Sequence, residues 1–370
     1  MNNRERFQAI LHGRAADRMP AVHFGYTPEV VKKWVQEGHL PKDLLELEDY
    51  SYELEDIISQ RLGFDFGLHA SRVTTTELFP FFQEQLVETL ENGFEKWRNS
   101  DGVYVLSKKG AGSIPAEIDH LLKDRASWET YYLPKLVYSE ERFSQEEAEH
   151  IKAERQRGNP VGLHCGSLFG RIRDYLGIVG FSYLLADDEE LVQEIFHTVG
   201  SLCLKAVERT LETGLSFDYG HFWEDMCYKN GSLVSPKLFE TYTADYYRKI
   251  TSLLLRHGID LVSVDCDGKI DDLISIWLSC GVNTMFPIEV GTWDASIEPW
   301  RKTYGPSLRG IGGMKKQLFA LSYEDIDREI ERLKPLVALS GYIPCPDHRI
   351  PEDARFEVVQ YYCEKIKEIL

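Results

Sequence analysis

The chain has 370 residues, 43% of them hydrophobic, and a net charge of −18. This hydrophobic content supports a large core and excludes a disordered protein. The acidic balance argues against binding nucleic acid or anionic membranes. The chain contains no run of about 18 apolar residues, so no membrane-spanning helix is expected. The opening segment lacks the apolar core of a signal peptide, and seven scattered cysteines form no disulfide pattern, so a cytoplasmic protein is expected.

The first 110 residues give three structural signals. Apolar residues at helical spacing predict an amphipathic helix over 3–12, and residues 19–24 predict a short strand. Residues 85–107 carry the turn pairs Asn92-Gly93 and Asp101-Gly102 between alternating segments. This pattern predicts a small antiparallel β-meander, which we interpret as an insertion because the remaining chain has a different rhythm.

From about residue 116 the chain alternates between helices and strands. Such alternation is typical of a parallel sheet covered by helices. Six strands in succession, without a dinucleotide-binding glycine motif, predict a (β/α)8 barrel that forms one domain over residues 1–370. The expected strands are 161–166, 217–223, 259–266, 282–289, 308–313 and 341–345. The expected helices are 140–157, 187–214, 235–258, 270–281, 323–341 and 353–370.

Polar and ionisable residues follow each of these six strands. Active sites of such barrels lie at the carboxyl ends of the strands, so these residues are candidates for one site. They are His164 and Cys165; Glu224 and Asp225; Asp265, Cys266 and Asp267; Glu289; Gly312 and Gly313; and Cys345, Asp347 and His348.

Two cysteines in this set suggest a metal site. Two thiolates with an imidazole or a carboxylate suit zinc with one open position, so Cys266 and Cys345, with His348 or Glu289, are candidate ligands. The alternative is two unrelated, half-buried thiols.

The adjacent acids Glu224 and Asp225 are candidates for acid–base catalysis, because Trp223 beside them predicts a dry neighbourhood. A solvated loop or a helix cap is the alternative. Asp267 is a third candidate acid, and His164 is a candidate substrate contact or a packed core residue.

Five segments resemble the uroporphyrinogen decarboxylase-like superfamily, in family order and over most of the chain. They are RERFQAILHGRAADRMPAV, FWEDMCYKNGSLVSPKLF, VDCDGKIDDLISIWLSCGVNTMFPIEVG, LRGIGGMKKQLF and GYIPCPDHRIPED. The resemblance implies a (β/α)8 barrel. The decarboxylases of this superfamily carry an arginine-rich segment after the first strand, where this chain has HFGYTPEVVKKW, which argues against a multiply anionic porphyrinogen as substrate.

The other branch of the superfamily comprises cobalamin-dependent methyltransferases. They bind zinc through a His-x-Cys pair and a cysteine near the end of the chain. By this resemblance Cys266 and Cys345 are zinc ligands, Val264 replaces the histidine, and Asp265, Asp267, Glu289 or His348 supplies the third ligand.

The resemblance therefore implies a zinc-dependent methyltransferase that moves a methyl group between a small substrate, a methyl ether or a thiol, and a corrinoid protein. An aromatic methyl ether would need an apolar pocket, for which Trp223, Phe286 and Tyr342 are the expected lining. Glu224 or Asp225 would protonate the leaving oxygen. The alternatives are decarboxylation of another acid and a non-catalytic tetrapyrrole- or corrinoid-binding protein.

Overall fold

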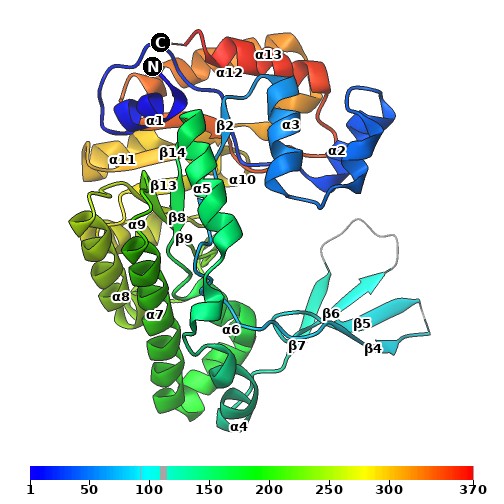
Figure 1. Cartoon of the computed structure of the whole chain (residues 1–370), viewed down its shortest axis with the longest axis vertical. Helices are drawn as coiled ribbons and strands as arrows, with labels where there is room; N and C mark the ends of the chain where they lie inside the picture. Colours follow the sequence, from blue (N-terminus) through cyan, green and yellow to red (C-terminus); the bar gives the residue numbers. More distant parts are fainter. Residues whose placement is uncertain (92, 109–114, 370) are drawn as a thin grey trace.

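A parallel sheet of seven strands forms the centre of the computed structural model, which describes residues 1–91, 93–108 and 115–369. Helices cover the sheet (Figure 1). In pairing order the strands are β15 (Tyr342–Pro346), β14 (Arg309–Met314), β13 (Thr284–Ile288), β12 (Val262–Asp265), β9 (Tyr219–Trp223), β8 (Gly162–His164) and β3 (Ala70–Ser71).

Long helices connect most of these strands, and their apolar faces build the core around residues such as Trp34, Trp128 and Trp277. The helices are α1 (Asn3–Leu11), α2 (Pro28–Gln36), α3 (Tyr52–Leu62), α4 (Arg125–Ser127), α5 (Gln145–Arg157), α6 (Gly170–Asp187), α7 (Glu189–Glu212), α8 (Pro236–Arg256), α9 (Asp271–Ser279), α10 (Val290–Trp293), α11 (Ile297–Tyr304), α12 (Tyr323–Val337) and α13 (Phe356–Ile366).

The first strand of the chain lies beside both edges of this sheet. β1 (Val22–His23) pairs in parallel with β2 (Phe66–Gly67), which precedes β3 by only two residues. On its other side the chain after β1 forms a bridge between Tyr26 and Ile350, beyond β15. Among the described residues no hydrogen-bonded ladder joins β1 to β15. The predicted parallel sheet with outer helices is therefore confirmed, and its closure into a barrel is not shown by strand pairing.

The helix predicted over 235–258 illustrates how local sequence sets these elements. Ser235 caps α8 by accepting a hydrogen bond from the backbone N–H of Leu238, and Pro236 occupies the first helical position. Gly258 follows the helix with a φ of +78°, a left-handed conformation that favours glycine. Four of the six predicted strands contain a strand of the structure, and the other two, 308–313 and 341–345, each end one residue before β14 and β15 do. The six predicted helices contain α5, α7, α8, α9, α12 and α13.

The predicted meander is present and larger than expected. β4 (Gln85–Thr89), β5 (Phe94–Arg98), β6 (Val103–Lys108) and β7 (Ala116–His120) form an antiparallel sheet that projects from the body of the protein (Figure 1). The fourth strand was not predicted, because its sequence AEIDH is mostly polar. Asn92, half of one predicted turn, lies outside the described residues.

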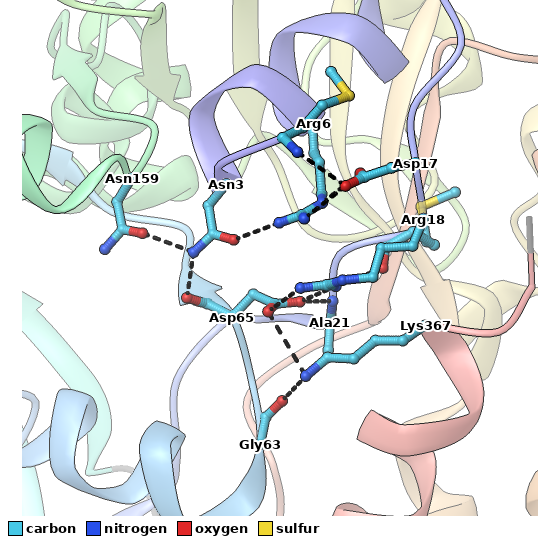
Figure 2. A network of polar contacts seen from close by, with 11 residues as sticks. Asn3, Arg6, Asp17, Arg18, Ala21, Gly63, Asp65, Asn159 and Lys367 are labelled. Carbon is cyan, nitrogen blue, oxygen red and sulfur yellow. Dashed lines mark hydrogen bonds and ion pairs between the residues drawn. The ribbon is translucent and has the colours of Figure 1, made fainter.

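A network of polar side chains fastens the amino ends of the strands (Figure 2). Asp65 accepts hydrogen bonds from both terminal nitrogens of Arg18, at 2.7 Å, and from the backbone N–H of Ala21 at 2.8 Å. Lys367 Nζ lies 3.6 Å from the same carboxylate. The side-chain amide of Asn3 donates to the Asp65 carbonyl. The network joins α1, the approaches to β1 and β2, and the end of α13.

No helix among the described residues is long and apolar enough to cross a membrane.

Candidate active site

Three aspartates come together at the carboxyl ends of β9 and β12. Asp225 lies two residues after β9, Asp265 is the last residue of β12, and Asp267 follows two positions later. One carboxylate oxygen from each lies within 4.8 Å of the others. β9 and β12 are parallel neighbours with Trp223 opposite Asp265, so their register places these acids at the same end of the sheet.

Asp265 is the most deeply buried of the three, at 8% exposure. No hydrogen bond or ion pair reaches its carboxylate from any residue that the structure describes. Burial raises its pKa well above the ordinary value, and the negative charges of Asp225 and Asp267 raise it further. The site thus holds a carboxyl group that strongly resists ionisation.

Asp225 is held in an unusual backbone conformation, with a φ of +44°. Aspartate tolerates this left-handed region better than most residues, at a cost of about 1 kcal/mol or more. The backbone N–H of Asp267 donates to Asp225 Oδ1 at 3.0 Å, and Arg173 donates to the Asp225 carbonyl at 2.6 Å. Burial and the charge of Asp267 raise the pKa of Asp225 to about 6.

Two further predicted residues border the cluster. His348 Nε2 lies 3.6 Å from Asp267 Oδ2. Glu289 accepts hydrogen bonds from the backbone N–H of Gly268 and from the Thr292 hydroxyl, and burial followed by the charge of Asp267 raises its pKa. Gly268 has a φ of +86°, and a Cβ there would collide with the Cys227 backbone. Only glycine therefore fits this close turn.

Aromatic rings form the wall next to the acids. Phe24, directly after β1, meets Phe286 edge to face with ring centroids 4.7 Å apart and His348 at 5.4 Å. His221 of β9 lies 5.9 Å from Phe286. Phe24 and Phe286 lie far apart in the sequence, so the fold assembles this wall.

Two arginines cover Trp223 on one side of the site. The guanidinium groups of Arg171 and Arg173 lie 5.1 and 5.8 Å from the indole ring. His164, on neighbouring β8, is buried, and desolvation followed by the charge of Arg72 lowers its pKa well below the ordinary value. His164 is therefore neutral near pH 7.

Glu224 has a different role from the predicted acid–base catalysis. It is fully buried and accepts hydrogen bonds from the backbone N–H groups of Leu168, Phe169 and Gly170, and from the Tyr247 hydroxyl. These donors lie at the beginning of α6, where unpaired N–H groups attract negative charge. The alternative reading of Glu224 as a helix cap is the one its surroundings support.

Tyr342 does not line the site as predicted. It is the first residue of β15, at the amino end of the strand, and its hydroxyl donates to the Gly312 carbonyl at 2.7 Å. The prediction was wrong because it placed an aromatic residue at the rim without regard to which end of the strand it occupied.

Among the described residues, Cys266 and Cys345 do not form the predicted zinc site as a group of three ligands. Cys266 Sγ accepts a hydrogen bond from the backbone N–H of Met226, and its pKa is raised by burial and by the adjacent Cys227 thiol. Burial and the charge of Asp347 raise the pKa of Cys345. Neither thiol, nor Glu289 nor His348, belongs to a group of three potential ligands; among the described residues the aspartate cluster is the group that forms.

Phe24 and Arg173 were not among the predicted site residues, and Asp265 was only one of several candidates for a third metal ligand. A signal for Asp265 was present, because Asp265 and Asp267 are two positions apart and alternate residues of an extended chain point to the same side. Phe24 carried no such signal, because its place beside Phe286 depends on packing between the segment after β1 and the distant strand β13.

Comparison with known proteins gives a fold but no family. No protein-family model and no curated protein matches the chain. Among solved structures, a methyltransferase from Methanosarcina mazei is 16% identical, with a TM-score of 0.62, over 100% of this chain and 99% of that one. A B12-independent methionine synthase from Shewanella sp. W3-18-1 is 9% identical, with a TM-score of 0.45, over 95% of this chain and 98% of that one.

A third structure, a putative vitamin-B12-independent methionine synthase from Listeria monocytogenes, is 11% identical, with a TM-score of 0.38, over 60% of this chain and 69% of that one. The match to the Methanosarcina protein shows that the two chains share a fold along their whole length.

Proposed function

We propose that this protein is a methyltransferase of the uroporphyrinogen decarboxylase-like superfamily, a single-domain (β/α)8 barrel that moves a methyl group between a small substrate and a corrinoid protein. The substrate is a methyl ether or a thiol. The observation that carries the proposal is the full-length fold likeness to the Methanosarcina methyltransferase, joined to a cluster of acids at the carboxyl ends of the strands.

The site combines aromatic side chains with the cluster of three aspartates. Phe24 is partly exposed and packs edge to face on the buried ring of Phe286, so it offers an apolar surface to a small group. Trp223, which is also partly exposed, lies two residues before Asp225. His348 links these rings to the three aspartates, because its ring lies 5.4 Å from that of Phe24 and its Nε2 lies 3.6 Å from Asp267 Oδ2. A methyl group bound against the rings would place its oxygen or sulfur toward the acids.

The reaction needs stabilisation of the atom that loses or gains the methyl group. In transfer from an ether, the C–O bond breaks, the reduced cobalt of the corrinoid supplies the electron pair of the new C–Co bond, and the old pair stays on oxygen. That oxygen then needs a proton or a cation. In transfer to a thiol, sulfur loses its proton and attacks the methyl group, while cobalt keeps the pair of the C–Co bond.

Two assays test the proposal. The purified chain is mixed with cob(I)alamin and 2-methoxyphenol, or with methylcobalamin and 2-mercaptoethanol, and the corrinoid absorbance is followed. We expect turnover in one pair. Phe286→Leu should raise KM several-fold because it removes a ring from the wall. Tyr342→Phe is the matched control and should leave KM unchanged, because Tyr342 lies at the amino end of β15 and its hydroxyl already donates to the Gly312 carbonyl.

Three outcomes contradict the proposal. Absence of turnover with both substrate pairs would exclude methyl transfer as the activity. Release of carbon dioxide from uroporphyrinogen would establish a carboxy-lyase instead. A corrinoid spectrum that shifts on binding without any turnover would indicate a binding protein.

A further inference from the structure

We infer that Asp225, Asp265 and Asp267 together bind one divalent cation through oxygen atoms, and that Mg²⁺ or Mn²⁺ is the class of ion that fits. The inference concerns the same site as the proposed function and gives it a metal of a different kind from the cysteine-bound zinc expected from the sequence. Ion binding is measured on the protein alone. The experiment therefore tests this inference independently of the proposed methyl transfer.

The spacing of the ligand atoms matches a single small ion. One oxygen from each aspartate lies within 4.8 Å of the others. Around Mg²⁺, with bonds of about 2.1 Å, neighbouring octahedral ligands are about 3 Å apart and opposite ligands about 4.2 Å apart.

A buried carboxylate without a partner is the second observation. Asp265 is 8% exposed and receives no hydrogen bond or ion pair from the described residues, and Asp267 Oδ1 is also buried without a partner there. Other buried aspartates of this chain are fully engaged. Asp218 binds Arg4 and the Val161 N–H, and Asp347 accepts from two backbone N–H groups. A cation is the partner that Asp265 lacks.

The type of donor atom selects the ion. Carboxylate oxygens suit hard cations such as Mg²⁺ and Mn²⁺, whereas thiolates select softer metals. The sulfur of Cys266 already accepts the Met226 N–H. The neighbouring contacts also orient the ligands, since the Asp267 N–H donates to Asp225 and His348 lies 3.6 Å from Asp267.

The measurement is calorimetric titration of the EDTA-treated full-length chain with Mg²⁺, Mn²⁺ and Zn²⁺ in turn, with the electron paramagnetic resonance of Mn²⁺ as a second readout. We expect saturable binding of one Mn²⁺ or Mg²⁺ per chain. Asp265→Asn should weaken it more than about tenfold, because a direct ligand matters more than an outer-shell partner. Asp245→Asn, an exposed acid on α8, is the matched control and should bind as the wild type does.

Circular dichroism shows whether Asp265→Asn is folded, and Asp267→Asn, at the edge of the cluster, replaces it if it is not. The inference is overturned by a wild-type chain that binds neither Mg²⁺ nor Mn²⁺. It is equally overturned by unchanged affinity in the aspartate variants, or by tight Zn²⁺ binding that Cys266→Ser abolishes and Asp265→Asn does not.

Discussion

Asp65 and Asp265 lie near opposite ends of the parallel strands and show two opposite uses of the same residue. Burial alone would raise the pKa of Asp65, but the hydrogen bonds from Arg18 and Ala21 and the charge of Lys367 outweigh it and hold the pKa below the ordinary value (Figure 2). At Asp265 burial and the charges of Asp225 and Asp267 raise the pKa well above the ordinary value, and the opposing charge of Arg349 does not offset them. A buried carboxylate that is paired stabilises the fold, and one that is left unpaired marks a candidate functional site.

The largest expected effect on the free energy of unfolding comes from substituting the paired aspartate, Asp65. Asp65→Asn should lower the free energy of unfolding at pH 7 by about 3 kcal/mol, because it removes a charge-assisted pair and leaves Arg18 without its partner. Urea denaturation measures the change. The control is Asp17→Asn, which removes an exposed ion pair with Arg6 at the same end and should have a much smaller effect. Equal losses in the two variants would contradict the distinction.

The stabilisation by Asp65 should also depend on pH in a defined direction. The folded-state pKa of Asp65 is lowered, so its contribution is present above the unfolded-state value of about 3.9 and is lost as the pH falls through the folded-state pKa. The difference in unfolding free energy between the wild type and Asp65→Asn should therefore shrink in acid. A constant difference between pH 7 and pH 3 would show that the charge is not involved.

A smaller change of opposite sign in the free energy of unfolding is expected from substituting the unpaired aspartate, Asp265. The folded-state pKa of Asp265 is raised, so ionised Asp265 opposes folding once the pH exceeds the unfolded-state value. In metal-free protein at pH 7, Asp265→Asn should raise the free energy of unfolding by about 1 kcal/mol, because the neutral amide avoids the cost of keeping this carboxyl group either protonated or charged beside two other acids. Thermal unfolding in EDTA measures it. A destabilised variant would mean that Asp265 has a partner in the folded state.

The sequence predicted the architecture better than the site, and for a physical reason. Helix caps such as Ser235 and the β/α alternation act over short distances, so pattern reasoning found α8 and the strands around it. Of the predicted rim residues, Asp225, Asp265 and Asp267 come together in the structure. Which way each side chain points depends on tertiary packing, so Glu224, Tyr342 and the two cysteines received roles that their surroundings do not support.

The contacts between the two ends of the chain also bear on how it is made. Lys367 reaches Asp65, Arg309 donates to the carbonyl of Leu11, and Trp34 donates to the carbonyl of Ala354. During synthesis the amino-terminal segments emerge from the ribosome hundreds of residues before these partners do. Their final positions therefore have to wait for the last helix, and the half-made chain is the form that most needs protection by chaperones.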